Sequence, residues 1–299
     1  MLDKVFVIVV TYKGHEWYDQ CFRSLRASTV PVRVIAVDNA SRDGSVEFIR
    51  EHFPEVHLIC SEVNLGFGRA NNLGIRYALD NECDYVFLLN QDAWVEPDTL
   101  RSLIEVHKKN IDYGVLSPMH LNKEKNHLNF MMEEGHGKME LVSDLYLGIV
   151  RDVYDISYVN AAGWLIPRTT LMKIGGFCPA IFHYGEDDDY LNRLKYHKIK
   201  VGLCPAARIV HDSKHRVQDA ALYFQKANEE QMDLYLDITK DIDLKAIVHR
   251  AYLRGLLCLI KGNKEKAKTL WKKGSFIRNH KEEIERCRSF HKLIQPNWL

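Results

Sequence analysis

The alternation of short apolar runs with helical periodicity over residues 4–90 constrains the fold most strongly. Residues 5–10 form a continuous, largely β-branched run, which is the pattern of a strand buried on both faces of a parallel sheet. Three more strands are predicted at 32–37, 56–60 and 85–89, with a helix in each interval. Such repeated strand-helix units indicate a doubly wound, mainly parallel α/β sheet, which binds ligands at the carboxyl ends of its strands.

Polar residues follow each of the four predicted strands. They are Thr11 and Tyr12, then Asp38, Asn39 and Ser41, then Asn64, Gly66 and Gly68, and finally Asn90, Gln91 and Asp92. In a parallel sheet they share one edge, where an aromatic ring, carboxylates and close-approaching glycine backbone favour a nucleotide site. The alternative is that these residue types are common turn formers and helix caps. The first strand is not followed by G-x-G-x-x-G, which argues against a dinucleotide site.

Four consecutive acids, residues 186–189, open a predicted helix directly after an aromatic segment. The structural interpretation is a first helical turn whose carboxylates interact with the helix dipole. The alternative is functional, because a carboxylate beside apolar rings and other acids has a raised pKa, which suits a general base. The aromatic residues Phe182 and Tyr184 favour this second interpretation.

His211 ends an apolar segment at the point where the predicted sheet region finishes. A lone histidine is commonly structural or solvated. Together with Asp92, however, it offers one nitrogen and one oxygen ligand for Mg²⁺ or Mn²⁺, with diphosphate oxygens and water completing the coordination.

The rest of the chain divides into two regions. Residues 120–155 lack a clear period and indicate a flexible or antiparallel insertion, and residues 1–215 are predicted to form the sheet domain. Residues 216–299 are predicted to be helical. The predicted elements after the insertion are strands at 158–167 and 201–204, and helices at 168–174, 185–196, 222–236, 244–261, 264–276 and 281–293.

Composition limits the partners. The formal net charge is +1, which does not indicate nucleic acid, but residues 240–299 carry 15 Lys and Arg against 6 Asp and Glu. The seven cysteines are scattered and suggest neither a disulfide framework nor a zinc site. The start lacks a signal-like pattern and no apolar run reaches the length of a membrane span, so a cytoplasmic protein is expected.

Taken in order, these motifs resemble those of the inverting glycosyltransferase family 2, in its branch similar to bacterial rhamnosyltransferases of cell-surface polysaccharide synthesis. The resemblance covers roughly residues 4–215. The matching segments are 9–12, 37–41, 64–74, 90–92, 161–164 and 185–189, together with His211.

The resemblance implies a GT-A fold, a role for each motif and a divalent metal, Mg²⁺ or Mn²⁺. In the donor site, Thr11 and Tyr12 would line the base pocket, Asp38 would recognise the pyrimidine or ribose, and the remaining contacts would come from Asn64, Gly66, Asn72 and Gln91. Gly163 and Trp164 would face the acceptor, and Asp92 and His211 would hold the metal. Asp187 would be the base, with Glu186 as its neighbour or the alternative base.

The expected reaction is transfer of a sugar from a nucleotide diphosphate donor, dTDP-rhamnose or a UDP-sugar, to a hydroxyl of a saccharide or lipid-linked acceptor. Segment 90–92 lacks the first acid of D-x-D, and the Q-x-x-R-W signature of polymerising members is absent, which favours addition of a single sugar. The alternatives are a catalytically silent sugar-nucleotide or polysaccharide-binding protein and, less favoured, a nucleotidyltransferase.

The basic helical region lies outside the resemblance. Its lysines alternate with Leu, Ile and Trp271, which suits adsorption to an anionic membrane, at the inner face of the cell membrane. Formation of a homodimer, or packing on the catalytic domain with a solvated basic face, are the alternatives.

Overall fold

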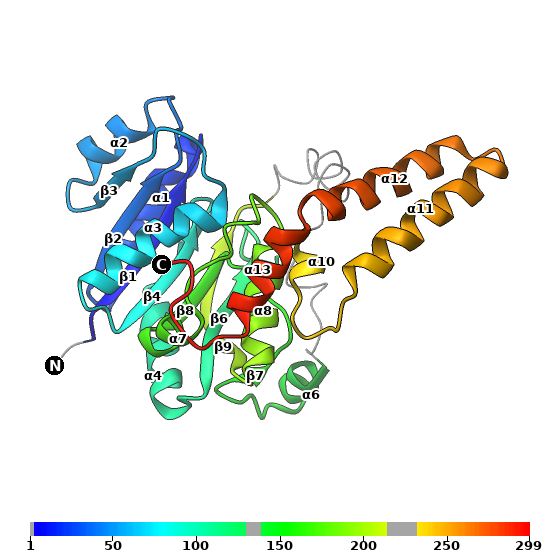
Figure 1. The fold of residues 1–299 in the computed structure, drawn as a ribbon. Coiled ribbons are helices and arrows are strands. Elements are labelled where there is room, and N and C mark those ends of the chain that lie inside the picture. The colour runs from blue at the N-terminus through cyan, green and yellow to red at the C-terminus, as the bar shows by residue number, and fades with distance from the viewer. Residues whose placement is uncertain (1–2, 130–138, 214–231) are drawn as a thin grey trace.

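A computed structural model describes residues 3–129, 139–213 and 232–299 (Figure 1). Their strands form one nine-stranded mixed sheet with the order β3-β2-β1-β4-β8-β6-β9-β5, and β7 pairs with β9. The strands are β1 (Val5–Thr11), β2 (Val32–Asp38), β3 (His57–Cys60), β4 (Tyr85–Asn90), β5 (Ala93–Val95), β6 (Tyr113–Leu121), β7 (Tyr154–Asp155), β8 (Gly163–Pro167) and β9 (Lys200–His211).

The N-terminal half of the sheet is parallel, as predicted. β1 lies between β2 and β4, and β3 flanks β2. The connecting helices are α1 (His15–Arg26), α2 (Ser45–His52) and α3 (Phe67–Asp80). The register places Thr11 opposite Asp38 and Val10 opposite Asn90, so the polar ends of the central strands coincide at one edge.

The second half of the sheet is mixed. β8 is antiparallel to β4 and β6, whereas β6 and β9 are parallel, and β5 runs antiparallel to β9. The sequence analysis did not predict β5, β6 or the helix α4 (Thr99–Lys109). It also ended the strand that corresponds to β9 at Cys204. β9 continues to His211 because its register to β6 shifts after Cys204, which accommodates Pro205 and Arg208 and hides the strand pattern.

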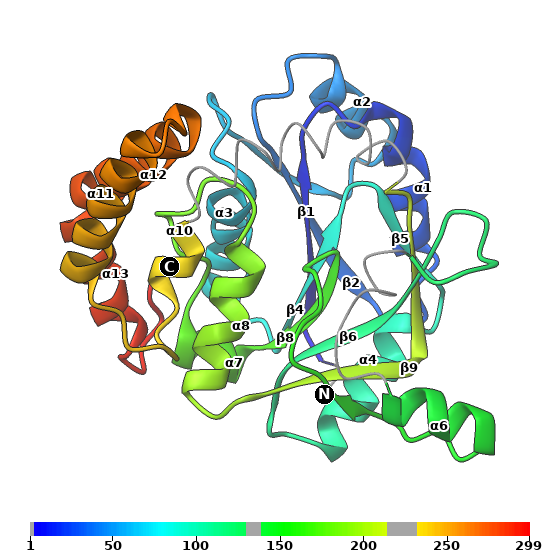
Figure 2. The same ribbon diagram turned by 90° about the vertical axis from the view of Figure 1, so that its right-hand side faces the viewer.

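Two apolar clusters cover the two faces of the sheet (Figure 2). One packs against α1, α2 and α4, and the other against α3, α7 (Arg168–Ile174) and α8 (Glu186–Tyr196). Within the predicted insertion the chain forms β7 and a helix that was not predicted, α6 (Met139–Leu147), while residues 130–138 lie outside the described part.

The described residues 232–299 contain four helices: α10 (Met232–Leu236), α11 (Leu244–Ile260), α12 (Lys264–Asn279) and α13 (Lys281–His291). The last three were predicted, whereas most of the predicted helix 222–236 lies outside the described residues. A third apolar cluster joins α10 and α13 to Cys178 and Ile181 of the sheet domain. α11 and α12 also contribute Leu244 and Ile277 to this cluster, and they form a hairpin that projects from the body (Figure 1). Among the described helices, none has the length and apolar content needed to cross a bilayer.

Candidate active site

Thr11 and Asp38 meet at the edge where β1 and β2 end. The hydroxyl of Thr11 donates to Asp38 Oδ1 at 3.2 Å, and the Ser41 backbone N–H donates to Oδ2 at 3.1 Å. All three residues are buried. A cavity of about 660 Å³ opens beside them, lined in part by Tyr12, Ser41 and Asn64. The Tyr12 ring is 39% exposed there and is therefore available for stacking on a base.

Gln91 positions the Tyr12 backbone. Its carboxamide Oε1 accepts from the Tyr12 N–H at 2.7 Å, and its Nε2 donates to the Tyr12 carbonyl at 3.0 Å. Both polar ends of the side chain are thus engaged by the backbone of one residue, Tyr12. Gln91 therefore holds the backbone at Tyr12, a role that the motif alone does not distinguish from direct donor contact.

The loop after β3 is fixed by side-chain amides and by a close backbone approach. Asn39 donates to Asn64 Oδ1 at 3.0 Å, and the Gly66 N–H donates to the same oxygen at 2.9 Å. Gly66 has φ +80°, and a Cβ atom there would lie 1.9 Å from the Phe182 carbonyl oxygen. Glycine is therefore required where this loop contacts the segment that leads to the acids.

Asn72 ties α3 to that same segment. Its Nδ2 donates to the Phe177 carbonyl at 2.8 Å, and its Oδ1 accepts from the Phe177 N–H at 2.8 Å. Asn72 was predicted to shape the donor wall, and the structure shows that its amide is engaged by protein backbone. Any effect of Asn72 on the donor is therefore exerted through the position of residues 177–186.

Asp187 lies next to the end of β4. Its Oδ2 accepts from the Ala161 N–H at 3.1 Å, and the neighbouring Ala162 carbonyl accepts from the Asn90 N–H at 3.1 Å. The carboxylate is half-buried in the first turn of α8. The short loop at 160–162 thus brings the acids to the edge that carries Asn90 and Asp92.

Asp92 and His211 face each other across neighbouring chain segments. Asp92 Oδ1 lies 3.4 Å from His211 Nε2, and both side chains are buried. The pairing of Ala93 with His211 and the hydrogen bond from the Asp212 N–H to the Asp92 carbonyl at 2.9 Å hold this arrangement. Neither ring nitrogen of His211 has a hydrogen bond within the described residues.

This pair suits a divalent cation, because it combines a carboxylate oxygen with an imidazole nitrogen in a buried position. In the described part of the chain no group of three or more His, Cys, Asp or Glu side chains gathers that could hold a metal ion. The sequence analysis missed His120, whose ring centroid lies 6.2 Å from that of His211. Its strand, β6, was not predicted, so the sequence analysis had no basis for placing His120 near His211.

Comparison with known proteins decides the family. Residues 6–173 match the model of glycosyl transferase family 2. The chain belongs to this family. The prediction made from its motifs is therefore confirmed, and the protein is a glycosyltransferase.

Curated relatives of this glycosyltransferase carry similar names. It is 26% identical to the low-salt glycan biosynthesis hexosyltransferase Agl10 of Haloferax volcanii, over 71% of this chain and 68% of the relative. It is 23% identical to the rhamnosyltransferase WbbL of Escherichia coli, over 75% and 88%. It is 25% identical to the N-acetylglucosaminyl-diphospho-decaprenol L-rhamnosyltransferase of Mycobacterium tuberculosis, over 72% and 78%.

Solved structures confirm the GT-A fold. Residues 1–349 of S. aureus TarS in complex with UDP align with TM-score 0.56 and 15% identity, over 93% of this chain and 72% of that one. The longer TarS chain is covered over only 36% of its length. GalNAc-T7, solved with UDP, GalNAc and Mn²⁺, aligns with TM-score 0.55 and 15% identity, over 71% of this chain and 44% of that one.

Two of the four acids that open α8, Glu186 and Asp189, differ from Asp187 in their surroundings. Glu186 is buried, and its burial, followed by the neighbouring charge of Asp187, raises the pKa of its carboxyl to about 8. His183 Nδ1 lies 3.8 Å from Glu186 Oε1. Asp189 is also buried but is paired with Arg193, whose Nε donates to its Oδ2 at 3.0 Å. Asp189 therefore has a structural contact that the run of four acids did not reveal.

Glu186→Gln is expected to make thermal stability less sensitive to alkaline pH. The folded-state pKa of about 8 lies above the ordinary value of 4.5, so the stability that this group contributes is complete below 4.5 and is lost as pH rises through 8. Glutamine stays neutral throughout. Between about pH 6 and 9 the Tm of the wild type should therefore fall relative to that of the variant. Parallel pH profiles of the two melting temperatures would contradict this.

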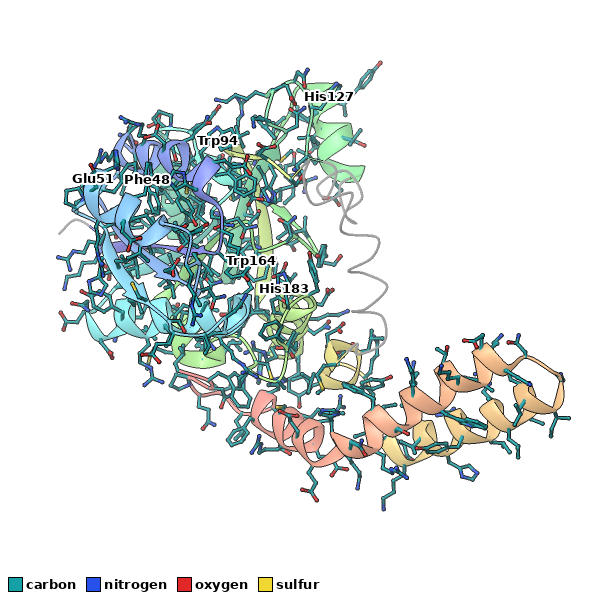
Figure 3. The ribbon with its side chains drawn as sticks, turned by 90° about the horizontal axis from the view of Figure 1, so that it is seen from above. Phe48, Glu51, Trp94, His127, Trp164 and His183 are labelled. Atoms are coloured by element: carbon teal, nitrogen blue, oxygen red, sulfur yellow. The ribbon has the colours of Figure 1, made fainter. Side chains whose placement is uncertain are left out.

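The predicted acceptor residues Gly163 and Trp164 are core residues in the structure. Gly163 pairs with Leu89 inside the sheet. Trp164 has 0% exposed surface and packs against the rings of Phe177 and Tyr190, with centroids 6.3 and 5.8 Å away (Figure 3). A fully enclosed side chain contacts protein alone, which corrects the expectation that Trp164 faces the acceptor. An aromatic residue after small residues is equally typical of a buried strand.

Proposed function

We propose that this glycosyltransferase inverts the anomeric configuration while moving one sugar from dTDP-rhamnose or a UDP-sugar to a hydroxyl of a saccharide or lipid-linked acceptor. The observation that carries the proposal is the convergence of the cavity lined by Tyr12 and Ser41, the Asp92–His211 pair and Asp187 at one sheet edge. The rhamnosyltransferase names of two relatives support the donor class, and the decaprenol in one name supports a lipid-linked acceptor. Cell-surface polysaccharide synthesis is the corresponding role.

The proposed donor site uses the cavity beside Tyr12. The exposed ring stacks on the base, while Thr11 and Ser41 hold the Asp38 carboxylate toward the ribose or pyrimidine. Asp92 and His211 would hold a divalent cation, which offsets negative charge on the departing diphosphate. This places the donor phosphates between the cavity and the acids of α8.

Asp187 is the proposed base. Its half-buried carboxylate takes the proton of the acceptor hydroxyl while the acceptor oxygen forms a bond to the anomeric carbon. The bond from that carbon to the diphosphate oxygen breaks, and the diphosphate leaves with the bonding electrons. Attack opposite the leaving group inverts the configuration in one displacement. In this proposal residues 1–215 form the catalytic domain and residues 216–299 the basic helical region.

A thermal-shift screen of UDP, dTDP, GDP and CMP, each with and without Mn²⁺, tests the proposal. At a hundredfold excess over Kd, a ligand that binds only the folded state adds about 2.7 kcal/mol, which corresponds to a Tm rise of roughly 5 °C. We expect this rise with UDP or dTDP, and a larger one with Mn²⁺. Asp92→Asn should lose the Mn²⁺-dependent part and retain the rest.

Asp152→Asn is the matched control, because that carboxylate is 66% exposed and its ion pair with Lys109 lies on the surface. It should behave as the wild type does. No shift with any nucleotide on folded protein would overturn the donor site and favour the catalytically silent alternative. A Mn²⁺ effect that survives in Asp92→Asn would overturn the metal role of that residue.

A further inference from the structure

The α11–α12 hairpin is held together by close packing along its inner face. Gly255 contacts the ring of Trp271 so closely that a Cβ atom there would lie 2.3 Å from Nε1. The Trp271 Nε1–H donates to the Tyr252 carbonyl at 3.2 Å, and the Tyr252 and Ser275 hydroxyls lie 2.9 Å apart. The hairpin is therefore a preformed unit, and it extends away from the catalytic body in two views (Figures 1 and 3).

The opposite face of α11 carries an apolar stripe. Leu253, Leu256, Leu257 and Ile260 are 50%, 49%, 49% and 74% exposed. Their spacing of three, four and seven residues places them on one side of the helix, away from the buried Gly255 that faces α12. No described residue buries this stripe, although each side chain is large and aliphatic.

The hairpin is also strongly basic. Residues 244–279 contain ten Lys and Arg against one acid, Glu265. At 100° per residue, Arg250, Arg254 and Lys261 fall along one border of the apolar stripe. An apolar stripe with a basic border is the pattern of a helix that lies in the interface of an anionic membrane.

We propose that the α11–α12 hairpin docks this enzyme on an anionic lipid surface, with the stripe entering the boundary between headgroups and acyl chains. The basic side chains then meet lipid phosphates. A second copy of the hairpin is a poorer partner, because it would bring the same large positive charge against the first. The projection of the hairpin lets it reach a membrane while the sheet of the catalytic body stays in water (Figure 1).

Vesicle co-sedimentation of the full chain tests the proposal. The wild type should bind vesicles of phosphatidylcholine with 30% phosphatidylglycerol and dissociate from them at high salt. It should not bind vesicles of pure phosphatidylcholine. The triple variant Leu253→Ser, Leu256→Ser, Ile260→Ser should bind about 100-fold more weakly. The triple variant Arg250→Gln, Arg254→Gln, Lys261→Gln should lose the preference for anionic lipid, because these exposed cations border the stripe. Ile111→Ser removes an aliphatic side chain that is 80% exposed outside the hairpin and should bind as the wild type does.

The substituted side chains are exposed, and thermal melts verify that each variant is folded. Equal binding to both vesicle types, binding to neither, or equal loss in Ile111→Ser would overturn the proposal. A dimer in light scattering that the serine variant dissociates, without vesicle binding by the wild type, would assign the stripe to a second copy instead. Because vesicle binding is measured without sugar transfer, its failure is distinct from failure of the proposed function.

Discussion

Asp187→Asn is expected to lower kcat by about 10²- to 10⁴-fold while leaving nucleotide binding intact, because an amide cannot accept the proton of the acceptor hydroxyl. Asparagine keeps an oxygen that can accept from the Ala161 N–H, now 3.1 Å from the carboxylate, so the local fold is retained. The measurement is kcat at saturating donor, together with the nucleotide-induced Tm shift of the same preparation.

Two neighbouring substitutions serve as controls for this prediction. Asp188→Asn changes an exposed acid one residue away and should leave kcat within a few-fold. Glu186→Gln preserves the form that dominates below a pKa of about 8, so at neutral pH it should cost far less than Asp187→Asn. If instead Glu186→Gln abolished transfer and Asp187→Asn did not, the base would be Glu186.

The sequence predicts best the parts of the molecule whose signals are local. The strands β1 to β4 follow from short apolar runs, and their polar ends share an edge because parallel strands end on the same side. The Asp92–His211 pair was predicted from its ligand types and from the family resemblance, and the structure brings these residues together. Their approach depends on the pairing of β5 with β9, which no local period in the sequence reveals.

The failed or missing predictions concern partners that are distant along the chain. Gln91 and Asn72 lie in the motifs as expected, but both use their amides on the backbone of other segments. Trp164 illustrates a second limit, since the same aromatic side chain would suit a sugar-facing surface or a core. Which of the two applies is decided by whether Phe177 and Tyr190 pack around it.

The C-terminal helices have similar apolar patterns in the sequence but are packed differently in the structure. All of α11, α12 and α13 were predicted as amphipathic helices, yet Ile284 and Cys287 of α13 enter the third apolar cluster whereas Leu253 and Ile260 of α11 remain exposed. The periodicity gives an apolar face in each case but does not state what covers it. That difference separates a structural role for α13 from the surface role proposed for the hairpin.

Arg193→Met is expected to lower the free energy of unfolding by about 3–5 kcal/mol, because it leaves a buried carboxylate without its cation. Arg193 and Asp189 are each 1% exposed, and Arg193 also donates to the Ile174 and Gly176 carbonyls at 2.9 and 2.7 Å. Burial raises the pKa of Asp189 to about 6 even beside the arginine, so desolvation outweighs the attraction. His291 Nδ1 lies 3.4 Å from Asp189 Oδ1, but burial, followed by the charge of Arg193, lowers the pKa of His291, so in the wild type it adds no positive charge beside Asp189.

Urea denaturation at pH 7 measures this loss, and two variants show its cause. Arg23→Met breaks an exposed pair with Asp19 and should cost less than about 1 kcal/mol. Adding Asp189→Leu to Arg193→Met removes the stranded charge and should recover part of the stability, although the Ile174 and Gly176 carbonyls remain unpaired. A double variant no more stable than Arg193→Met would show that those carbonyl contacts, and not the ion pair, account for the loss.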